Sequence, residues 1–311
     1  MNDISTVTNK FHFTLYADDT SLVEPICTFS MGTSANTETS DAINSELRLI
    51  TDWLCLNKLS LNAKKTKMMI FHHRQKNISK LNLQLYINNT KIEQVKEFDF
   101  LGMVIDECMT WNSHINKIAG KISRVNGVLS RLKRFVPSGI LKMIYNALIQ
   151  PHLNYGILLW GKNVSRIQKL QKWAVRSITL SKYNAHTDPL FIKLKLLKIT
   201  DIYMLCLLKF YHKYKKNLLP PYFTGMFDVT YPSHNYETRQ RNQPVLTGCR
   251  TKLAEASIRY SLPSVIPKLN ANITNKISTH SLIGLSNYAK SFFISQYNPI
   301  CEIENCYICN I

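Results

Sequence analysis

The stretch FTLYADDT, from Phe13 to Thr20, places two adjacent acidic residues between two short apolar segments. The segments Phe13–Ala17 and Ser21–Val23 are rich in aromatic and branched residues, which favour β-strands. The intervening Asp18–Thr20 suits a tight turn, because Asp tolerates turn geometry. The pattern predicts a β-hairpin that carries two carboxylates at its tip.

Two carboxylates on such a corner are candidate metal ligands. Asp18 and Asp19 offer the hard oxygen atoms that Mg²⁺ prefers. In a two-metal site the ions lie roughly 3.5 to 4 Å apart and stabilise the attacking and leaving oxygens of a phosphoryl displacement. The alternative is an Asp-Asp turn that closes a hairpin in solvent, and the motif YADD alone favours that alternative. The neighbouring segments therefore have to decide between the two.

The segments up to residue 110 predict an α+β arrangement. After a loop rich in Ser and Thr at 29–40, Asp41 can cap a helix. The apolar residues of that helix recur every three or four positions, which predicts a buried face: Ile43, Leu47, Ile50 and Leu54. Short strands are expected at 68–71, 81–87, 90–92 and 98–105, with Asn88-Asn89 as a hairpin turn.

Beyond Trp111 the apolar period becomes helical. An apolar stripe runs from Ile115 to Leu132, and further helices are expected at 138–149, 165–180 and 199–215. After Pro220-Pro221 the chain is rich in Asn, Ser, Thr and Pro, which predicts a linker and a small irregular region. The expected domains are therefore residues 1–110, 111–220 and 221–311.

The positive charge is concentrated in the helical segment. The chain carries a net charge of +19, and residues 111–216 contain 20 Lys and Arg against only Asp188 and Asp201, a net charge of +18. Four basic residues lie off the apolar stripe of the first helix: Lys117, Lys121, Arg124 and Arg131. A basic face usually is solvated surface charge, but this concentration with so few acids favours contact with a nucleic-acid backbone.

The cysteines and the apolar runs bear on location and on metal binding. The eight cysteines are mostly isolated among apolar neighbours, which is typical of reduced thiols in an intracellular protein. Cys301, Cys306 and Cys309 have a spacing that suits zinc, but a fourth ligand would have to come from His280 or another chain, so zinc is not expected. No signal peptide or membrane span is indicated, and the sequence does not decide between nucleus and cytoplasm.

Taken together, Phe13–Thr20 and several downstream blocks resemble the reverse transcriptases of non-LTR retrotransposons, in particular Jockey-like elements. Phe13–Thr20 resembles the motif C hairpin of that family. Other blocks follow in the family's order: Trp53–Thr66 resembles motif D, Phe100–Gly102 the primer-grip hairpin of motif E, His114–Leu132 the start of the thumb, and Pro151–Trp160 and Ile167–Thr179 the segments after it. The resemblance covers about residues 1–220, and the combination is far more specific than YADD alone.

The resemblance implies a truncated polymerase palm followed by a helical thumb and connection. It implies RNA-templated DNA synthesis with Mg²⁺, an RNA template, a DNA primer and deoxynucleoside triphosphates. Asp18 and Asp19 would then be the catalytic metal ligands, with Tyr16 and Ala17 beside the primer end. Lys65 would lie near the triphosphate, although it could also be an ordinary surface lysine, and Tyr16 could simply fill a strand.

Gly102 would let the primer-grip backbone approach the nucleic acid closely.

The chain also departs from the family's pattern. The metal-binding Asp of motif A and the pocket of motif B have no counterpart here, and Asp3 is too close to the hairpin to replace that Asp. We therefore expect a fragment, or the product of a degenerate gene, that is not a competent polymerase alone. The alternative is a non-enzymatic nucleic-acid-binding remnant, which would not depend on Asp18. An RNA-dependent RNA polymerase is disfavoured, because those enzymes more often carry Gly-Asp-Asp at the hairpin.

Overall fold

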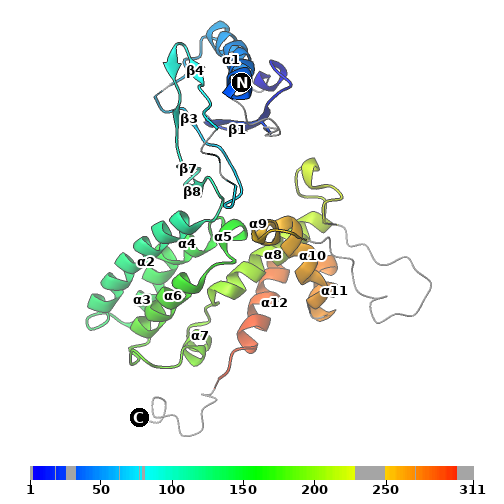
Figure 1. The fold of residues 1–311 in the computed structure, drawn as a ribbon. Coiled ribbons are helices and arrows are strands. Elements are labelled where there is room, and N and C mark those ends of the chain that lie inside the picture. Colours follow the sequence, from blue (N-terminus) through cyan, green and yellow to red (C-terminus); the bar gives the residue numbers. More distant parts are fainter. Residues whose placement is uncertain are drawn as a thin grey trace, which may run out of the picture. The chain divides into compact units, whose positions relative to one another are not determined.

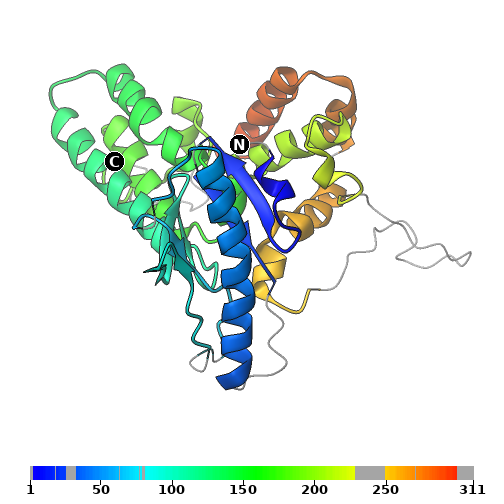
Figure 2. The ribbon, with the colours of Figure 1, turned by 90° about the horizontal axis from the view of Figure 1, so that it is seen from above.

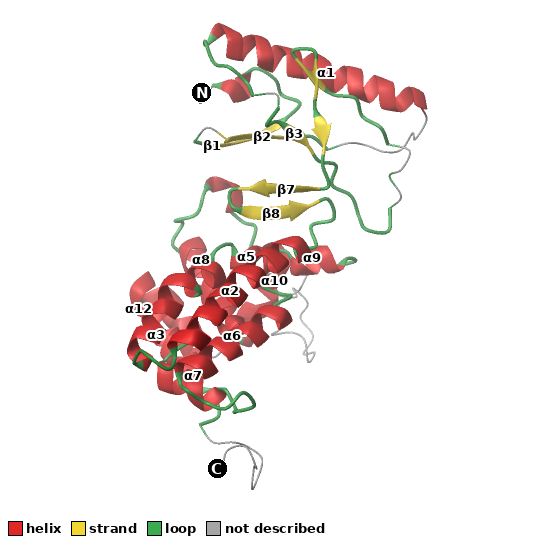
Figure 3. Ribbon diagram, turned by 90° about the vertical axis from the view of Figure 1, so that its left-hand side faces the viewer, coloured by secondary structure: helices red, strands yellow, loops and turns green. Residues whose placement is uncertain are grey.

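A computed structural model of the chain divides into two compact units, Met1–Met109 and Thr110–Ile311 (Figure 1). The structure describes residues 3–17, 19–25, 33–62, 64–76, 78, 81–227, 249–269 and 271–299. The first unit mixes short strands with one long helix, and the second is helical (Figure 3). The division between the units lies next to the boundary expected at residue 110.

The first unit contains strands that pair two at a time. Its elements are η1 (Ile4–Thr6), β1 (His12–Tyr16), β2 (Asp19–Val23), α1 (Thr33–Leu56), β3 (Lys67–Met68), β4 (Tyr86–Ile87), β5 (Thr90–Lys91), β6 (Glu93–Gln94), β7 (Glu97–Phe100) and β8 (Met103–Asp106). The pairs β1–β2, β4–β5 and β7–β8 are antiparallel hairpins, whereas β3 and β6 pair in parallel.

Helix α1 supplies the core of this unit with the four residues that its periodicity predicted. Ile43, Leu47, Ile50 and Leu54 are buried, and they cluster with residues of the hairpins. The helix starts at Thr33, however, so the loop expected at 29–40 is wrong for residues 33–40. These residues lack Gly and Pro, and the hydroxyl of Ser40 donates to the carbonyl of Asn36 within the helix at 2.7 Å.

The strand expected at 81–87 is reduced to Tyr86–Ile87, because a side chain of α1 forms hydrogen bonds with the backbone around Gln84. The amide of Asn44 donates to the carbonyl of Gln84 at 2.9 Å, and the Asn44 side-chain oxygen accepts from the N–H of Tyr86 at 2.9 Å. A side chain of α1 thus takes the place of a partner strand. The other strands expected in this unit are present but short.

Two of the hairpins turn through left-handed residue pairs. Asn88 and Asn89 have φ angles of 46° and 60°, and Leu101 and Gly102 have φ angles of 48° and 80°. Positive φ at both central positions matches the right-handed twist of the flanking strands. The turn predicted at Asn88-Asn89 is confirmed.

The second unit is built from helices. They are α2 (Asn112–Leu132), α3 (Ser138–Leu148), α4 (Gln150–Asn154), α5 (Ile157–Trp160), α6 (Ser165–Ile178), α7 (Asp188–Leu194), α8 (Ile199–Lys215), α9 (Lys252–Ala256), α10 (Ile258–Val265), α11 (Ala271–Thr279) and α12 (Leu282–Ser295), with short 3₁₀ turns η2 (Pro221–Phe223) and η3 (Ile266–Lys268). The helices expected at 138–149, 165–180 and 199–215 are confirmed as α3, α6 and α8.

Helices α2 and α6 run in parallel side by side, and a buried glutamine joins α6 to two neighbours. Asn126 of α2 donates to the carbonyl of Leu170 at 2.9 Å. The amide nitrogen of Gln171 donates to the hydroxyl of Tyr145 and to the carbonyl of Leu197, and its oxygen accepts from the N–H of Ile199, each at 2.9 Å. Gln171 therefore connects α6 to α3 and to the start of α8.

The irregular region expected at 221–311 differs from what the structure describes there. Residues 252–295 contain α9 to α12, and α11 and α12 pack against α8 (Figure 1). Leu285 and Ala289 of α12 are fully buried. The hydroxyl of Tyr297 donates to Asp201 of α8 and accepts from the backbone N–H of Lys198. Short helices are rarely stable alone, and α11 and α12 are held here by their packing against α8.

Candidate functional site

The YADD hairpin is shaped by a two-residue connection. Tyr16 pairs with Asp19 in the β1–β2 register, so Asp19 and Thr20 belong to the strand and not to the turn expected at 18–20. Ala17 has a φ of 51°, in the left-handed region that residues with a Cβ avoid. Asp18 lies outside the described residues.

The hairpin is fixed to the core at its base and open at its tip. Phe13 and Leu22 face each other across the register and pack against the α1 cluster. Phe11 meets Phe13 edge to face at 6.5 Å between ring centroids. The side chain of Tyr16 is 63% exposed, and Asp19 is exposed too. Figure 2 shows this hairpin beside the long helix α1. Tyr16 and Asp19, two of the residues predicted to meet a ligand, are thus exposed to solvent.

The described carboxylates do not by themselves form a metal site at this corner. Asp19 supplies hard oxygen atoms of the kind that bind Mg²⁺. Within the described ranges, which omit Asp18, no three or more His, Cys, Asp or Glu side chains gather as metal ligands. The roles of Asp18 and Asp19 as catalytic metal ligands stay predictions.

Lys65 lies in a turn that Asn62 closes. The backbone N–H groups of Lys65 and Thr66 donate to the carbonyl of Asn62 at 3.0 and 3.1 Å, and the N–H of Lys65 also contacts the Asn62 side-chain oxygen at 3.2 Å. The Lys65 side chain is exposed. Among the described residues, no hydrogen bond or ion pair joins it to Tyr16, Ala17 or Asp19. A shallow hollow adjoins this turn and is lined by Ser60, Leu61, Asn62, Lys64 and Thr90.

Gly102 occupies the second position of the β7–β8 turn. Its φ of 80° is a conformation that side chains with a Cβ rarely adopt, so the turn itself requires glycine. Gly102 is exposed, and Phe98 on β7 is partly exposed as well. A close approach of nucleic acid to this backbone stays a prediction.

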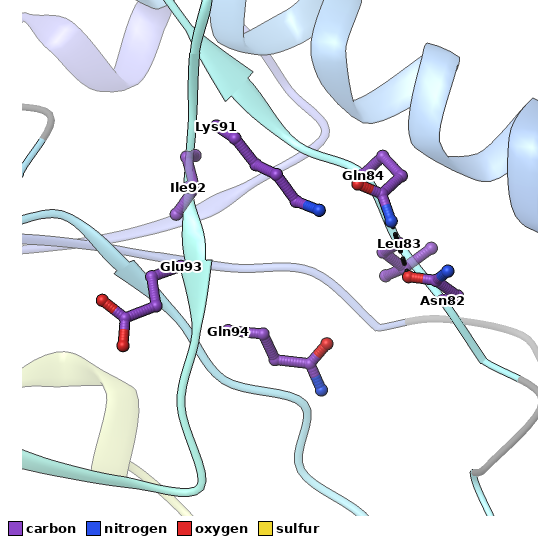
Figure 4. Close-up of a pocket in the computed structure, with 7 residues that line it drawn as sticks. All are labelled: Asn82, Leu83, Gln84, Lys91, Ile92, Glu93 and Gln94. Atoms are coloured by element: carbon purple, nitrogen blue, oxygen red, sulfur yellow. Dashed lines mark hydrogen bonds between the residues drawn. The ribbon is translucent and has the colours of Figure 1, made fainter.

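A second hollow in the first unit has no counterpart in the sequence predictions (Figure 4). Its lining residues are Asn82, Leu83, Gln84, Lys91, Ile92, Glu93 and Gln94. Gln84 donates to Asn82 at 2.7 Å, and Glu93 pairs with Lys67 of β3. Amides and one paired carboxylate can orient a polar ligand by hydrogen bonds. None of the predicted site residues lines this hollow, and no local motif marks it.

The basic face of α2, defined as Lys117, Lys121, Arg124 and Arg131, lies opposite the buried stripe of the helix. Ile115, Ile118, Ile122 and Leu129 point into the core with exposures of 5% or less. Arg124 and Arg131 are exposed, whereas Lys117 and Lys121 are half-buried. Burial and the charge of Lys121 lower the pKa of His152 on α4, which lies beside the basic face. The structure thus brings the four predicted residues together.

The candidate zinc ligands and the remaining cysteines lie in different parts of the chain. Cys301, Cys306 and Cys309 lie outside the described residues. The ring of His280 contacts Thr279 at 2.9 Å and Lys276 at 3.3 Å. Cys55, Cys108, Cys206 and Cys249 are free thiols, and burial raises the pKa of Cys206. Across the described part of the chain, no helix combines the length and apolar character that membrane crossing requires.

Comparisons with known proteins connect the chain to polymerases of mobile elements. No family model and no solved structure matches it. The chain is 24% identical over 172 residues, 53% of its length, to an RNA-directed DNA polymerase from mobile element jockey of Drosophila funebris, and 22% identical over 172 residues to a probable RNA-directed DNA polymerase from transposon X-element of Drosophila melanogaster. A jockey polymerase of Drosophila melanogaster is 24% identical over 194 residues, 60% of the chain.

The matches cover 18 to 20% of these relatives, so the chain spans about a fifth of their length. The chain is therefore similar, over about half of its own residues, to RNA-directed DNA polymerases of mobile elements.

Proposed function

We propose that this chain is a C-terminal part of an RNA-directed DNA polymerase of a non-LTR retrotransposon. The first unit would contribute part of an α+β palm with YADD as motif C, and helices α2 to α8 the thumb and connection. The observation that carries the proposal is the similarity to the jockey and X-element polymerases, combined with an exposed Tyr16–Asp19 corner on a hairpin anchored to the core.

The proposed reaction is nucleotidyl transfer at the YADD corner. Mg²⁺, when bound there, would stabilise the charge of the attacking and leaving oxygens. Tyr16 and Ala17 would position the primer end, because an exposed ring next to an open backbone turn offers a flat contact. Asp19 would hold a metal ion together with Asp18. Two carboxylates from one hairpin are fewer than a two-metal site requires, so we propose that the 311-residue chain does not extend a primer alone.

Two further residues would act on the substrates. Lys65, exposed in the turn that Asn62 closes, would neutralise triphosphate charge or protonate the leaving pyrophosphate. Gly102 would present the backbone of the β7–β8 turn to the primer strand, since it is exposed and has no side chain of its own.

A second candidate function rests on the basic face alone. Residues 111–216 carry a net charge of +18, and α2 contains no acidic residue. In this alternative the chain binds RNA or an RNA–DNA hybrid without catalysis, through Lys117, Lys121, Arg124 and Arg131. The two candidates differ in whether any activity depends on Asp18.

The test combines primer extension with binding. The purified chain and its Asp18→Ala variant are incubated with an RNA template, a DNA primer, deoxynucleotides and Mg²⁺. We expect no extension from either, with RNA–DNA hybrid binding retained. Extension by the wild-type chain that Asp18→Ala abolishes would support the polymerase and contradict the proposed incompetence. Failure to bind the hybrid at low salt would contradict both functions.

Binding is assigned to α2 by charge removal. A variant with Lys117, Lys121, Arg124 and Arg131 changed to Gln should lower the slope of log affinity against log salt by about 3, at roughly 0.7 to 0.9 per phosphate contact. The control removes four charges elsewhere in the same unit: Lys182, Lys193, Lys195 and Lys213 changed to Gln. An equal loss in both variants would show that α2 is not the contact surface.

A further inference from the structure

Helix α2 carries a short pattern twice on its basic side. The sequence reads GKISR from Gly120 to Arg124 and GVLSR from Gly127 to Arg131, so glycine, serine and arginine recur after seven residues. Seven residues correspond to about two helical turns and about 10 Å along the axis. The two copies therefore lie one above the other on the same side of the helix.

In each copy the arginine bends back onto its own glycine. The Nε–H of Arg124 donates to the carbonyl of Gly120 at 3.4 Å, and the Nε–H of Arg131 donates to the carbonyl of Gly127 at 3.3 Å. Each guanidinium has five N–H donors in a planar fork, so four remain on the two terminal nitrogens. Both arginines are exposed. The helix thus holds two forks in the same orientation, one above the other.

Among the described residues, no neighbour requires Gly120 or Gly127 to be glycine. A Cβ built on either residue would meet no described atom within 4 Å, and neither residue has a positive φ. Gly161 differs, because a Cβ there would lie 2.4 Å from the carbonyl oxygen of Ile157. Glycine is disfavoured inside a helix compared with alanine. Two glycines with open space where a Cβ would lie, beside two arginines bonded to the helix backbone, indicate a surface that a binding partner approaches closely.

We propose that the pairs Gly120–Arg124 and Gly127–Arg131 form a phosphate ladder, two equivalent steps that each hold one phosphate of a nucleic-acid strand. The inference rests on the proposed nucleic-acid function of the basic face and adds its geometry. Each arginine fork binds two oxygens of one phosphate, which a single-point ammonium does not do. The bare glycine lets the sugar–phosphate backbone lie against the helix. Lys117 lies about one turn before the first step, and Lys121 lies within it, so both add positive charge beside that step.

The decisive variant is the double substitution Gly120→Ala with Gly127→Ala in the full chain. The added methyl groups enter open space, so the protein should fold, and its Tm should rise by about 4–8 °C because each of the two alanines favours the helix. The same methyl groups should keep the strand off the helix and weaken binding to a labelled RNA–DNA hybrid about tenfold. The control is Gly139→Ala on α3, another helical glycine with open space around it, which should leave affinity unchanged. Unchanged affinity with a raised Tm would overturn the ladder.

A second variant tests the arginine forks without changing charge. Arg124→Lys with Arg131→Lys keeps the net charge and should keep the salt slope, but it should weaken hybrid binding several-fold because the forks are lost. Binding equal to wild type would overturn the ladder.

The variant that removes the four charges of the basic face of α2 distinguishes failure of the ladder from failure of the proposed function. If that variant weakens binding and the glycine variant does not, the ladder is wrong and the basic face stands. If neither weakens binding, both are wrong. Competition by polyglutamate as effective as by the hybrid would overturn the assignment to nucleic acid in favour of an acidic protein partner.

Discussion

The two units differ in how completely they bury their cores. In the first unit the buried apolar side chains keep exposures of 1 to 9%, and most lie above 3%. In the second unit, side chains such as Ile122, Leu129, Leu153 and Ile167 reach 0%. Strand pairs of two to five residues against one helix enclose less than helices stacked on helices. The predicted catalytic corner therefore lies in the unit with the less completely buried core, and the predicted nucleic-acid-binding face lies in the unit with the more completely buried core.

The units also treat buried polar groups differently. Gln171 in the second unit is fully buried, its amide nitrogen donates two hydrogen bonds, and its amide oxygen accepts one. In the first unit Asn44 makes comparable bonds, but they lie in a partly buried or exposed setting. A bond shielded from water is costlier to break. Breaking the hydrogen bonds of Gln171 should therefore cost more free energy than breaking those of Asn44.

The largest expected effect comes from matched cavities in the two cores. Leu129→Ala on α2 should destabilise the second unit by about 4 kcal/mol, and Leu47→Ala on α1 should destabilise the first unit by about 2 kcal/mol, because a cavity in a tighter core is less able to collapse. Urea unfolding, monitored by amide hydrogen exchange, measures the free energy of unfolding of each unit separately. Equal losses would show that the cores do not differ in the way their exposures indicate.

Much of the second unit could be predicted from sequence, because each helix forms its backbone hydrogen bonds within its own segment. The apolar stripe of α2 and the boundaries of α3, α6 and α8 follow from helical periodicity. The helices after residue 250 could not be predicted in this way. Their stability depends on α8, through contacts such as Tyr297 to Asp201, and no local pattern carries that information.

The candidate site was predicted in part. Local sequence predicted the YADD hairpin, although its turn lies before Asp19 and not at 18–20, because the two strands are neighbours in sequence. The arginines folded onto Gly120 and Gly127 were missed as a unit, although their seven-residue repeat is visible in the sequence. The hollow beside Gln84 was also missed, although all of its lining residues fall between positions 82 and 94, on the two sides of a local hairpin.

The next effect concerns the buried glutamine. Gln171→Leu should destabilise the second unit by about 3 kcal/mol, because it leaves the hydroxyl of Tyr145, the carbonyl of Leu197 and the N–H of Ile199 without their partner. Urea unfolding of that unit measures the loss. Gln168→Leu, the same change at a partly exposed position of α6, should cost far less. Similar losses for both would mean that the polar contacts of Gln171 contribute little.

A smaller, pH-dependent effect is expected where α12 meets α8. Burial raises the pKa of Asp201, and the hydroxyl of Tyr297 opposes that rise. The folded protein therefore retains a proton that the unfolded chain loses, so this contribution to stability is full below the ordinary Asp pKa and is lost as pH rises through the raised pKa. Tyr297→Phe should cost about 1 to 2 kcal/mol.

That loss should be greater at pH 8 than at pH 4, because the variant leaves a charged, half-buried carboxylate without its hydroxyl donor. Unfolding curves at the two values measure the difference. Asp201→Asn serves as the reference, since it cannot ionise and should flatten the dependence. A Tyr297→Phe loss that is equal at both pH values would show that Asp201 does not titrate in this window.

The smallest effect returns to the first unit. Ala17 has a φ of 51° at the YADD turn, a conformation that costs a residue with a Cβ about 1 kcal/mol. Ala17→Gly should therefore stabilise the first unit by about that amount in urea unfolding, whereas Ala17→Ser should not, because serine keeps the Cβ. No gain from glycine would mean that the turn is unstrained. A gain would show that the chain keeps a strained residue at the corner proposed to meet the primer, where backbone strain is often retained for function.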